Sequence, residues 1–260
     1  METTAGSNRA EQLIKTFEAF RDQLDSHNER RERIIKISRD VTALAKKMIF
    51  SLHRLPPPSG TSSQVIPSGI QKDLDKRNSE IHELLRKAAV DLEGPNAYKY
   101  QKQLSGALQE YLEALTFQHY LETSTLLTYP AACALLSPLG ITLPESDFLL
   151  GWADTTGELM RRAISLLPAH PDSAREILVV LRGLWEGFEC LNVDTEGVRG
   201  TWGEIGKKMG VMRGSVQKVE DALYSVCVRG SERPAGMLDL GGGGGGNKRQ
   251  REVDDYVDNY

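Results

Sequence analysis

Two pairs of carboxylates stand at helical spacing in the sequence. Glu110 and Glu113 are three residues apart, and Asp154 and Glu158 are four apart, so each pair shares one face of a helix. Two helices that each present two carboxylates can enclose a hard divalent cation, because Mg²⁺ and Mn²⁺ prefer oxygen ligands. Carboxylate-held Mg²⁺ is a common means of hydrolysing phosphodiesters. The pattern therefore predicts a candidate metal site for phosphodiester cleavage.

The surroundings of the two pairs leave ordinary alternatives open. The helix around Glu110 is apolar over most of its circumference, which predicts burial and repulsion between its two acids, but a narrow solvated strip fits the same pattern. Asp154 and Glu158 share their side with Arg161, as solvated helix faces commonly do. A di-iron centre would require Glu-x-x-His motifs on two helices, and none of the five histidines stands three residues after a glutamate.

A basic run nearer the N-terminus is a candidate phosphate-binding wall. Its members are Arg30, Arg33, Lys36 and Arg39, and Lys46 and Lys47 continue it. Acidic residues lie among these bases, so a balanced solvated helix face is the alternative. The formal net charge of −4 excludes a uniformly basic surface, so a nucleic-acid site must be local or shared with a partner.

Other classes of site find no support in the sequence. The three cysteines are far apart and form no CxxC pair, which speaks against a zinc site or a disulfide framework and suits a reducing, intracellular compartment. The segment GEIGKK at 203–208 lacks the glycine spacing and the Ser/Thr of a P-loop. The polar N-terminus does not resemble a signal peptide, and no apolar run approaches the ~20 residues of a membrane span.

Helical periodicity, with no competing strand pattern, predicts an all-α fold. We expect a bundle of about six to seven mostly antiparallel helices, of which the first is very long and ends before the prolines at 56–58. The expected spans are 11–53, 70–92, 96–123, 142–167, 173–190 and 201–229. Capping boxes are expected at Thr142 with Glu145, Ser173 with Glu176, and Thr201 with Glu204.

Composition predicts one helical domain over residues 11–234, between a flexible N-terminus (1–10) and a disordered, glycine-rich and charged tail (235–260). Within the domain, 56–69 is expected to be a flexible linker because it is rich in proline, serine and glycine. Gly206, Gly210 and Gly214 recur every fourth residue. They indicate either close approach of another helix or a locally weak helix, since glycine costs ~1 kcal/mol relative to alanine.

Four stretches of the chain resemble the translin family, in particular its translin-associated factor X (TRAX) branch. They span 17–55, 108–123, 147–164 and 218–238, and the segments LQEYLEAL (108–115) and ADTTGEL (153–159) separate TRAX members from translin itself. The resemblance implies an all-α subunit that assembles with translin into a hollow, barrel-like hetero-octamer, which cleaves single-stranded RNA with Mg²⁺. It also implies that the family's acidic metal site corresponds to Glu110, Glu113, Asp154 and Glu158.

The expected function is therefore that of the catalytic subunit of a Mg²⁺-dependent endoribonuclease, in which Mn²⁺ can replace Mg²⁺ and one of the four acids also serves as general base. The alternative is a scaffold that binds and stabilises translin without catalysis. The chain lacks the bipartite basic run that animal members use for nuclear import. The cytoplasm is therefore the expected compartment, with the nucleus left open.

Overall fold

The computed structural model describes residues 3–57, 65–191 and 201–232, and every regular element in these ranges is helical. The elements are α1 (Thr3–His53), α2 (Ser68–Asp91), α3 (Pro95–Thr123), α4 (Tyr129–Leu136), the 3₁₀ helix η1 (Ser137–Leu139), α5 (Glu145–Leu166), α6 (Pro171–Cys190) and α7 (Thr201–Glu232). The all-α prediction is confirmed. The predicted tail at 235–260 and residues 58–64 of the predicted linker at 56–69 lie outside the described residues, and α2 already begins at Ser68.

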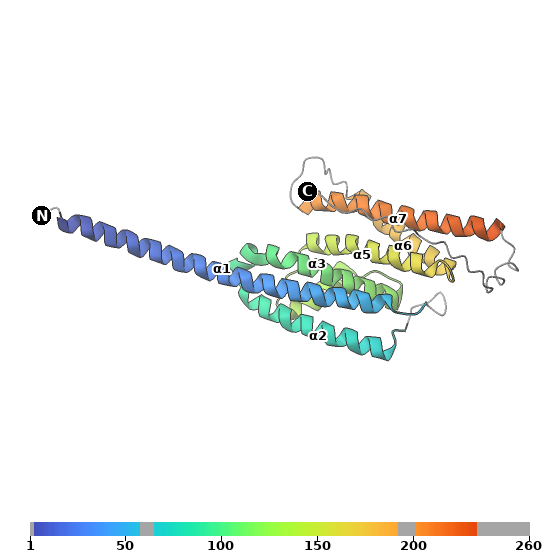
Figure 1. Cartoon of the computed structure of the whole chain (residues 1–260), viewed down its shortest axis with the longest axis horizontal. Helices are drawn as coiled ribbons and strands as arrows, with labels where there is room; N and C mark the ends of the chain where they lie inside the picture. The colour runs from blue at the N-terminus through green and yellow to red at the C-terminus, as the bar shows by residue number, and fades with distance from the viewer. Residues whose placement is uncertain (1–2, 58–64, 192–200, 233–260) are drawn as a thin grey trace, which may run out of the picture.

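The first helix projects far beyond the bundle (Figure 1). It begins at Thr3, eight residues before the predicted start, and ends at His53, ahead of the prolines. Before His27, the described side chains of α1 are all exposed, among them Leu13, Phe17 and Leu24 at 58–68%. Continuous burial starts only at Ile34, so the apolar periodicity of the first half does not serve this chain's own core.

Two predicted capping boxes are wrong, for a shared physical reason. The residue that precedes α5 is Pro144, not Thr142, and no side chain caps the helix. The α6 helix begins at Pro171, before Ser173, with His170 as its N-cap. Proline has no side-chain acceptor, so Pro144 cannot cap α5, and Pro171 suits the first turn of α6 because its fixed φ fits the helix and its missing N–H is not needed there. The third predicted box involves the side chain of Thr201, which lies outside the described side chains.

Helices that follow one another in the sequence mostly reverse direction, as expected, but those with the most extensive contacts run parallel (Figure 1). At one end of the α1–α3 pair, His27 contacts Tyr100, and at the other His53 packs on Phe117 with ring centroids 4.9 Å apart. The return from α3 to α5 uses the short elements α4 and η1, which the sequence analysis missed. Because α2, this return and α6 each bring the chain back, α1, α3, α5 and α7 run in one direction.

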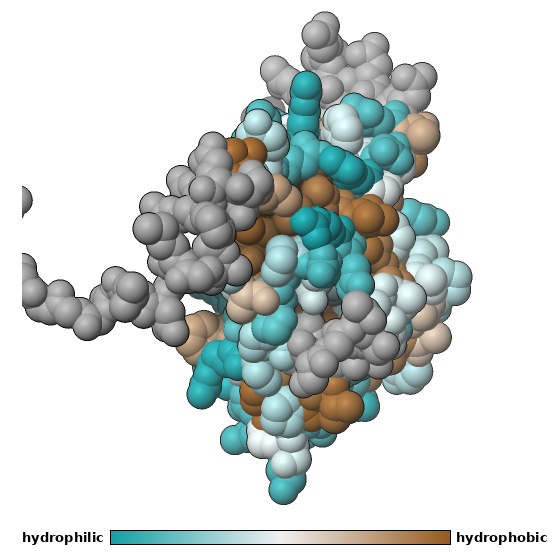
Figure 2. Space-filling view, turned by 90° about the vertical axis from the view of Figure 1, so that its right-hand side faces the viewer, coloured by the Kyte–Doolittle hydropathy of each residue, from teal (hydrophilic) through white to brown (hydrophobic). Residues whose placement is uncertain are grey.

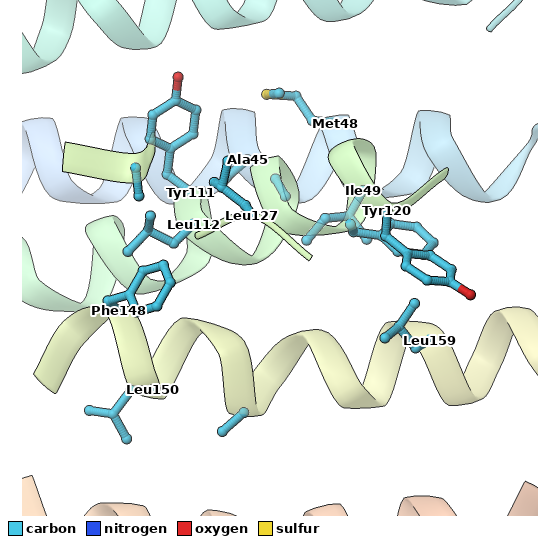
Figure 3. Close-up of a cluster of buried hydrophobic side chains, with 14 of the residues drawn as sticks. Ala45, Met48, Ile49, Tyr111, Leu112, Tyr120, Leu127, Phe148, Leu150 and Leu159 are labelled. Atoms are coloured by element: carbon cyan, nitrogen blue, oxygen red, sulfur yellow. The ribbon is translucent and has the colours of Figure 1, made fainter. Parts of the chain in front are cut away.

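The core is organised around α3, which lies between α1 and α5. Buried side chains from all three helices meet there, among them Met48, Leu112 and Leu159 (Figure 3). The α7 helix packs its buried residues on α5 and α6. In the described residues no helix is long and apolar enough to cross a membrane, and hydrophilic and apolar residues are interspersed on the face drawn in Figure 2.

Gly210 and Gly214 of the α7 glycine row make no close approach to the described part of the chain. A Cβ added at Gly210 or Gly214 would meet nothing within 4 Å. The close approach that the sequence analysis sought in α7 occurs instead at Gly151 of α5. A Cβ there would lie 2.9 Å from the Leu112 Cβ and 3.0 Å from the Gln109 carbonyl oxygen of α3. Only glycine allows α5 to pass α3 at this separation.

We therefore expect Gly151→Ala to destabilise the protein by about 1–3 kcal/mol, because the added methyl must push two packed helices apart. Gly157→Ala is the matched control on the same helix, since a Cβ at Gly157 meets nothing within 4 Å. This control should gain up to about 1 kcal/mol from helix propensity. Urea unfolding of the two variants measures both effects, and equal stabilities would contradict the close approach.

Candidate metal and phosphodiester site

The two carboxylate pairs face one cavity of about 800 Å³ between α1, α3, α5 and α7. Its lining includes Glu110, Glu113, Asp154 and Glu158, together with Lys46, His53 and Arg161 and the apolar residues Ile49, Phe50 and Val211. Glu110 and Glu113 project from one face of α3, and Asp154 and Glu158 from one face of α5. The parallel packing of α3 on α5 at Gly151 brings the two faces together.

Burial speaks against a solvated face for Glu113 and Glu158, whereas Glu110 and Asp154 are partly exposed. Glu113 is only 8% exposed. The side chains of Glu110, Asp154 and Glu158 are 26%, 34% and 12% exposed. Charged side chains are rarely buried to this extent unless they are paired, so the next question is what neutralises them.

Three of the four acids are paired with the protein's own cations. Lys46 Nζ lies 3.1 Å from Glu110 Oε1. Glu158 accepts hydrogen bonds from Arg161, at 2.9 Å, and contacts the Nε2 atom of His53.

Asp154 has a partner from a different helix. Lys208 Nζ of α7 donates to both carboxylate oxygens of Asp154. Of the four basic partners, the sequence analysis had included Lys46 in a basic run and Arg161 in a solvated face. It had assigned no role to His53 or Lys208, because nothing in their local sequence indicates which helix they will meet.

Glu113 differs from the other three acids because it has no hydrogen bond or ion pair to the described part of the chain. Burial, first of all, and then the negative charges of Asp154, Glu158 and Glu110 raise the pKa of Glu113 from its ordinary 4.5 to about 8. The Lys208 ammonium opposes this shift. The cations of the cavity thus pair with the other three acids and leave the charged form of Glu113 unfavourable, and a divalent cation would stabilise that form.

The donor set fits a hard divalent cation, but the side chains are not arranged as a ligand cage. Among the described residues, no group of three or more His, Cys, Asp or Glu side chains is placed to hold a metal ion. The reason is visible in the ion pairs, since Asp154 is turned to Lys208 and Glu110 to Lys46. Binding of Mg²⁺ or Mn²⁺ by the quartet would therefore require these carboxylates to exchange partners.

A buried polar link fixes the register of α3 against α5 about two turns of α5 before Asp154. Asp147, 4% exposed, accepts hydrogen bonds from Ser105 Oγ at 2.5 Å and Gln109 Nε2 at 2.8 Å. The sequence analysis missed this residue. A lone acid directly before the apolar run FLL (148–150) was the signal that could have indicated it, since a buried acid needs partners.

A second link fixes the end of α1. The guanidinium of Arg162, 3% exposed, donates to the carbonyl oxygens of Leu55 and Pro56, both at 2.8 Å. These carbonyls follow the last turn of α1, where backbone acceptors lack helical partners. Arg162 thereby ties the C-terminal end of α1 to α5 and holds His53 beside Glu158.

The predicted RNA-contacting residues do not reach the cavity. Arg30 and Arg33 both pair with Asp91 of α2, at 3.6 and 2.8 Å. Lys36 and Arg39 line a shallow surface pocket on α1 with Arg33. At a rise of about 1.5 Å per residue, even Arg39 lies roughly 10 Å along α1 from Lys46. The RNA-binding role of this run stays a prediction.

Comparisons with known proteins agree on one family. A family profile described as the Translin family matches residues 29–230. Translin-associated protein X of Pongo abelii is 30% identical over 255 residues, which cover 89% of this chain and 84% of that protein. The Translin-associated protein X homolog of Schizosaccharomyces pombe is 32% identical over 227 residues, covering 85% and 91%.

The fold also has a counterpart among solved structures. A chain in the crystal structure of AfC3PO superimposes with a TM-score of 0.59 at 22% identity, and the match covers 83% of this chain and 99% of that one. At this identity the likeness concerns the fold alone.

The raised pKa of Glu113 predicts a pH-dependent effect of Glu113→Gln on stability. Between pH 4.5 and about 8 the folded chain retains a proton that the unfolded chain has lost, so the free energy of unfolding falls as pH rises through this window. The Glu113→Gln variant has no carboxyl group to titrate at this position, so its free energy of unfolding does not fall in this way. We expect it to be more stable than the parent by about 2–4 kcal/mol at pH 9 and nearly unchanged at pH 5.

Thermal and urea unfolding with EDTA present measure this difference. The exposed Glu186 of α6 provides the matched control, and Glu186→Gln should have little effect at either pH. A Glu113→Gln effect of the same size at pH 5 and pH 9 would show that the burial and charge crowding of Glu113 had been misjudged.

Proposed function

Because the chain belongs to the Translin family, we propose that it is the catalytic subunit of a Mg²⁺-dependent endoribonuclease that acts on single-stranded RNA together with translin. One observation carries the proposal. Four carboxylates from two parallel helices face one cavity, and one of them, Glu113, is buried there without a hydrogen bond or ion pair to the described residues. Buried like charges of this kind are costly unless function requires them.

Glu110, Glu113, Asp154 and Glu158 would hold Mg²⁺ or Mn²⁺. When bound, the cation supplies Lewis acidity and positive charge for phosphodiester hydrolysis. The carboxylates orient the attacking water, and one of them accepts its proton as general base. Within the cavity, Lys46 and Arg161 have side chains 62% and 65% exposed, so their cationic ends can bind phosphate oxygens.

The projecting half of α1 supports an assembly with translin, which we propose to be a hetero-octameric barrel. Its exposed apolar residues lie where none of the described residues covers them. Large exposed apolar patches commonly mark protein interfaces. The similar proteins carry the name translin-associated, which suggests the partner.

A second function remains in competition, namely a non-catalytic scaffold that binds and stabilises translin. The ion pairs of Asp154 with Lys208, of Glu110 with Lys46 and of Glu158 with Arg161 favour it, because they give three of the acids a structural explanation. The two functions differ in one measurable property, which is metal-dependent cleavage that depends on the quartet.

The catalytic assignment predicts that Glu113→Gln and Asp154→Asn abolish cleavage in the complex with translin. We expect the rate on a single-stranded RNA oligonucleotide to fall by about 100-fold or more in each variant, as for removal of a group that acts in the transition state. Rates are measured by gel assay with Mg²⁺ and with EDTA, and Glu186→Gln is the control. Parental rates in both site variants would reject the catalytic role and leave the scaffold.

The partner assignment predicts that two aspartates on the projecting half of α1 prevent assembly. Phe17 and Phe20 are 68% and 54% exposed, so F17D/F20D should leave the fold of the bundle intact and remove the apolar contact. Val179→Asp on α6, also at a 68% exposed residue, is the control. Co-purification with translin and light scattering report the outcome.

For the parent we expect self-association when it is expressed alone and a defined particle with translin. Undiminished assembly of F17D/F20D would show that this half of α1 is not the interface.

A further inference from the structure

The packing of α7 places Lys208 next to the four acids that line the cavity. It stands on the inner side of α7, where Ile205 and Met212, three residues before and four after it, are each 1% exposed. Residues at these spacings share one helix face, so the face that buries α7 also directs Lys208 at α5. The adjacent Lys207 is exposed to solvent.

The ammonium of Lys208 contacts Asp154 in the way that a bound cation would. Its ammonium donates to both carboxylate oxygens of Asp154, and the two side chains are 28% and 34% exposed. Glu113 lies in the same cavity, is 8% exposed, and has no hydrogen bond or ion pair to the described residues. The ammonium of Lys208 thus lies beside a group of four acids in which only Glu113 has no such partner among the described residues.

We propose that Lys208 competes with the divalent cation for Asp154 and thereby sets the affinity of the site for its metal. The inference rests on the proposed function, because it takes the quartet as the metal site. An ammonium bonded to both oxygens of Asp154 and a metal ion bonded to the same oxygens exclude each other. Lysine suits such an exchange, since its flexible four-carbon stem lets the charge move away without a change in the helix.

This competition also explains why the four acids line one cavity without forming a ligand cage. Lys208 holds the Asp154 carboxylate towards α7, and Lys46 holds that of Glu110 towards α1. Lys46 is 62% exposed at its side chain, whereas Lys208 is 28% exposed. The less hydrated pair resists exchange more strongly, so Lys208 has the greater influence on metal affinity.

The test is direct Mn²⁺ binding to the full chain in complex with translin, measured by isothermal titration calorimetry and by the electron paramagnetic resonance of free Mn²⁺, without RNA. Lys208→Met keeps the apolar stem and removes the charge, and Lys207→Met is the matched control. We expect Kd to fall about tenfold in K208M, as for loss of one competing charge-assisted hydrogen-bonded pair. K207M should change Kd by less than about twofold, the effect of a screened surface charge.

A double-mutant cycle separates competition for Asp154 from a general change in charge. In an Asp154→Asn background, adding K208M should leave Kd unchanged, because the residue for which lysine competes is gone. An equal tightening in both backgrounds would overturn the proposal, as would an unchanged or weaker affinity of K208M alone. Lys208→Gln serves as the second neutral variant, and thermal unfolding checks that each complex is intact.

The outcomes also separate this proposal from the proposed function. If the parent binds Mn²⁺ and loses it on Glu113→Gln, but K208M binds as the parent does, the metal site stands and the role of Lys208 falls. If neither the parent nor K208M binds Mn²⁺, both proposals fail. Binding by K208M but not by the parent would support the competition in its strongest form.

Discussion

The backbone of α5 passes α3 at Gly151 with less room than a methyl group needs, and the candidate site depends on this approach. A larger residue would separate the helices and move Asp154 and Glu158 away from Glu110 and Glu113. The buried link from Ser105 and Gln109 to Asp147 then fixes how far one helix slides along the other. Arg162 ties the C-terminal end of α1 to α5 by a hydrogen bond.

This packing brings four carboxylates together, and cationic side chains from the surrounding helices pair with three of them. Lys46 comes from α1, Arg161 from α5 and Lys208 from α7, and each pairs with a different acid. Glu113 is deepest and has no such partner among the described residues, so the remaining electrostatic cost appears as its raised pKa. In the proposed metal site, a divalent cation would offset this cost.

The projecting half of α1 has an apolar face that the described bundle does not cover. The apolar residues of the projecting half of α1 repeat at helical spacing, yet nothing in the described chain buries them. A helix that extends so far gains no stability from its own core there, because helices in water depend on tertiary packing of an apolar face. The Translin family membership and the projecting helix thus agree with a subunit that is completed by assembly.

The sequence alone determined the helices and the pairing of the acids, because both follow from local spacing. The expected spans of α2 and α3 lie within two residues of those observed, and the four acids were identified before their neighbours were known. The tertiary structure decided three features that local spacing does not encode. The close contact is made at Gly151 rather than at the α7 glycines, and the helices that carry the acids run parallel. Lys208 and His53 contact the acids from segments that are distant in the sequence. Such contacts depend on which faces pack together, and packing is a property of the whole chain.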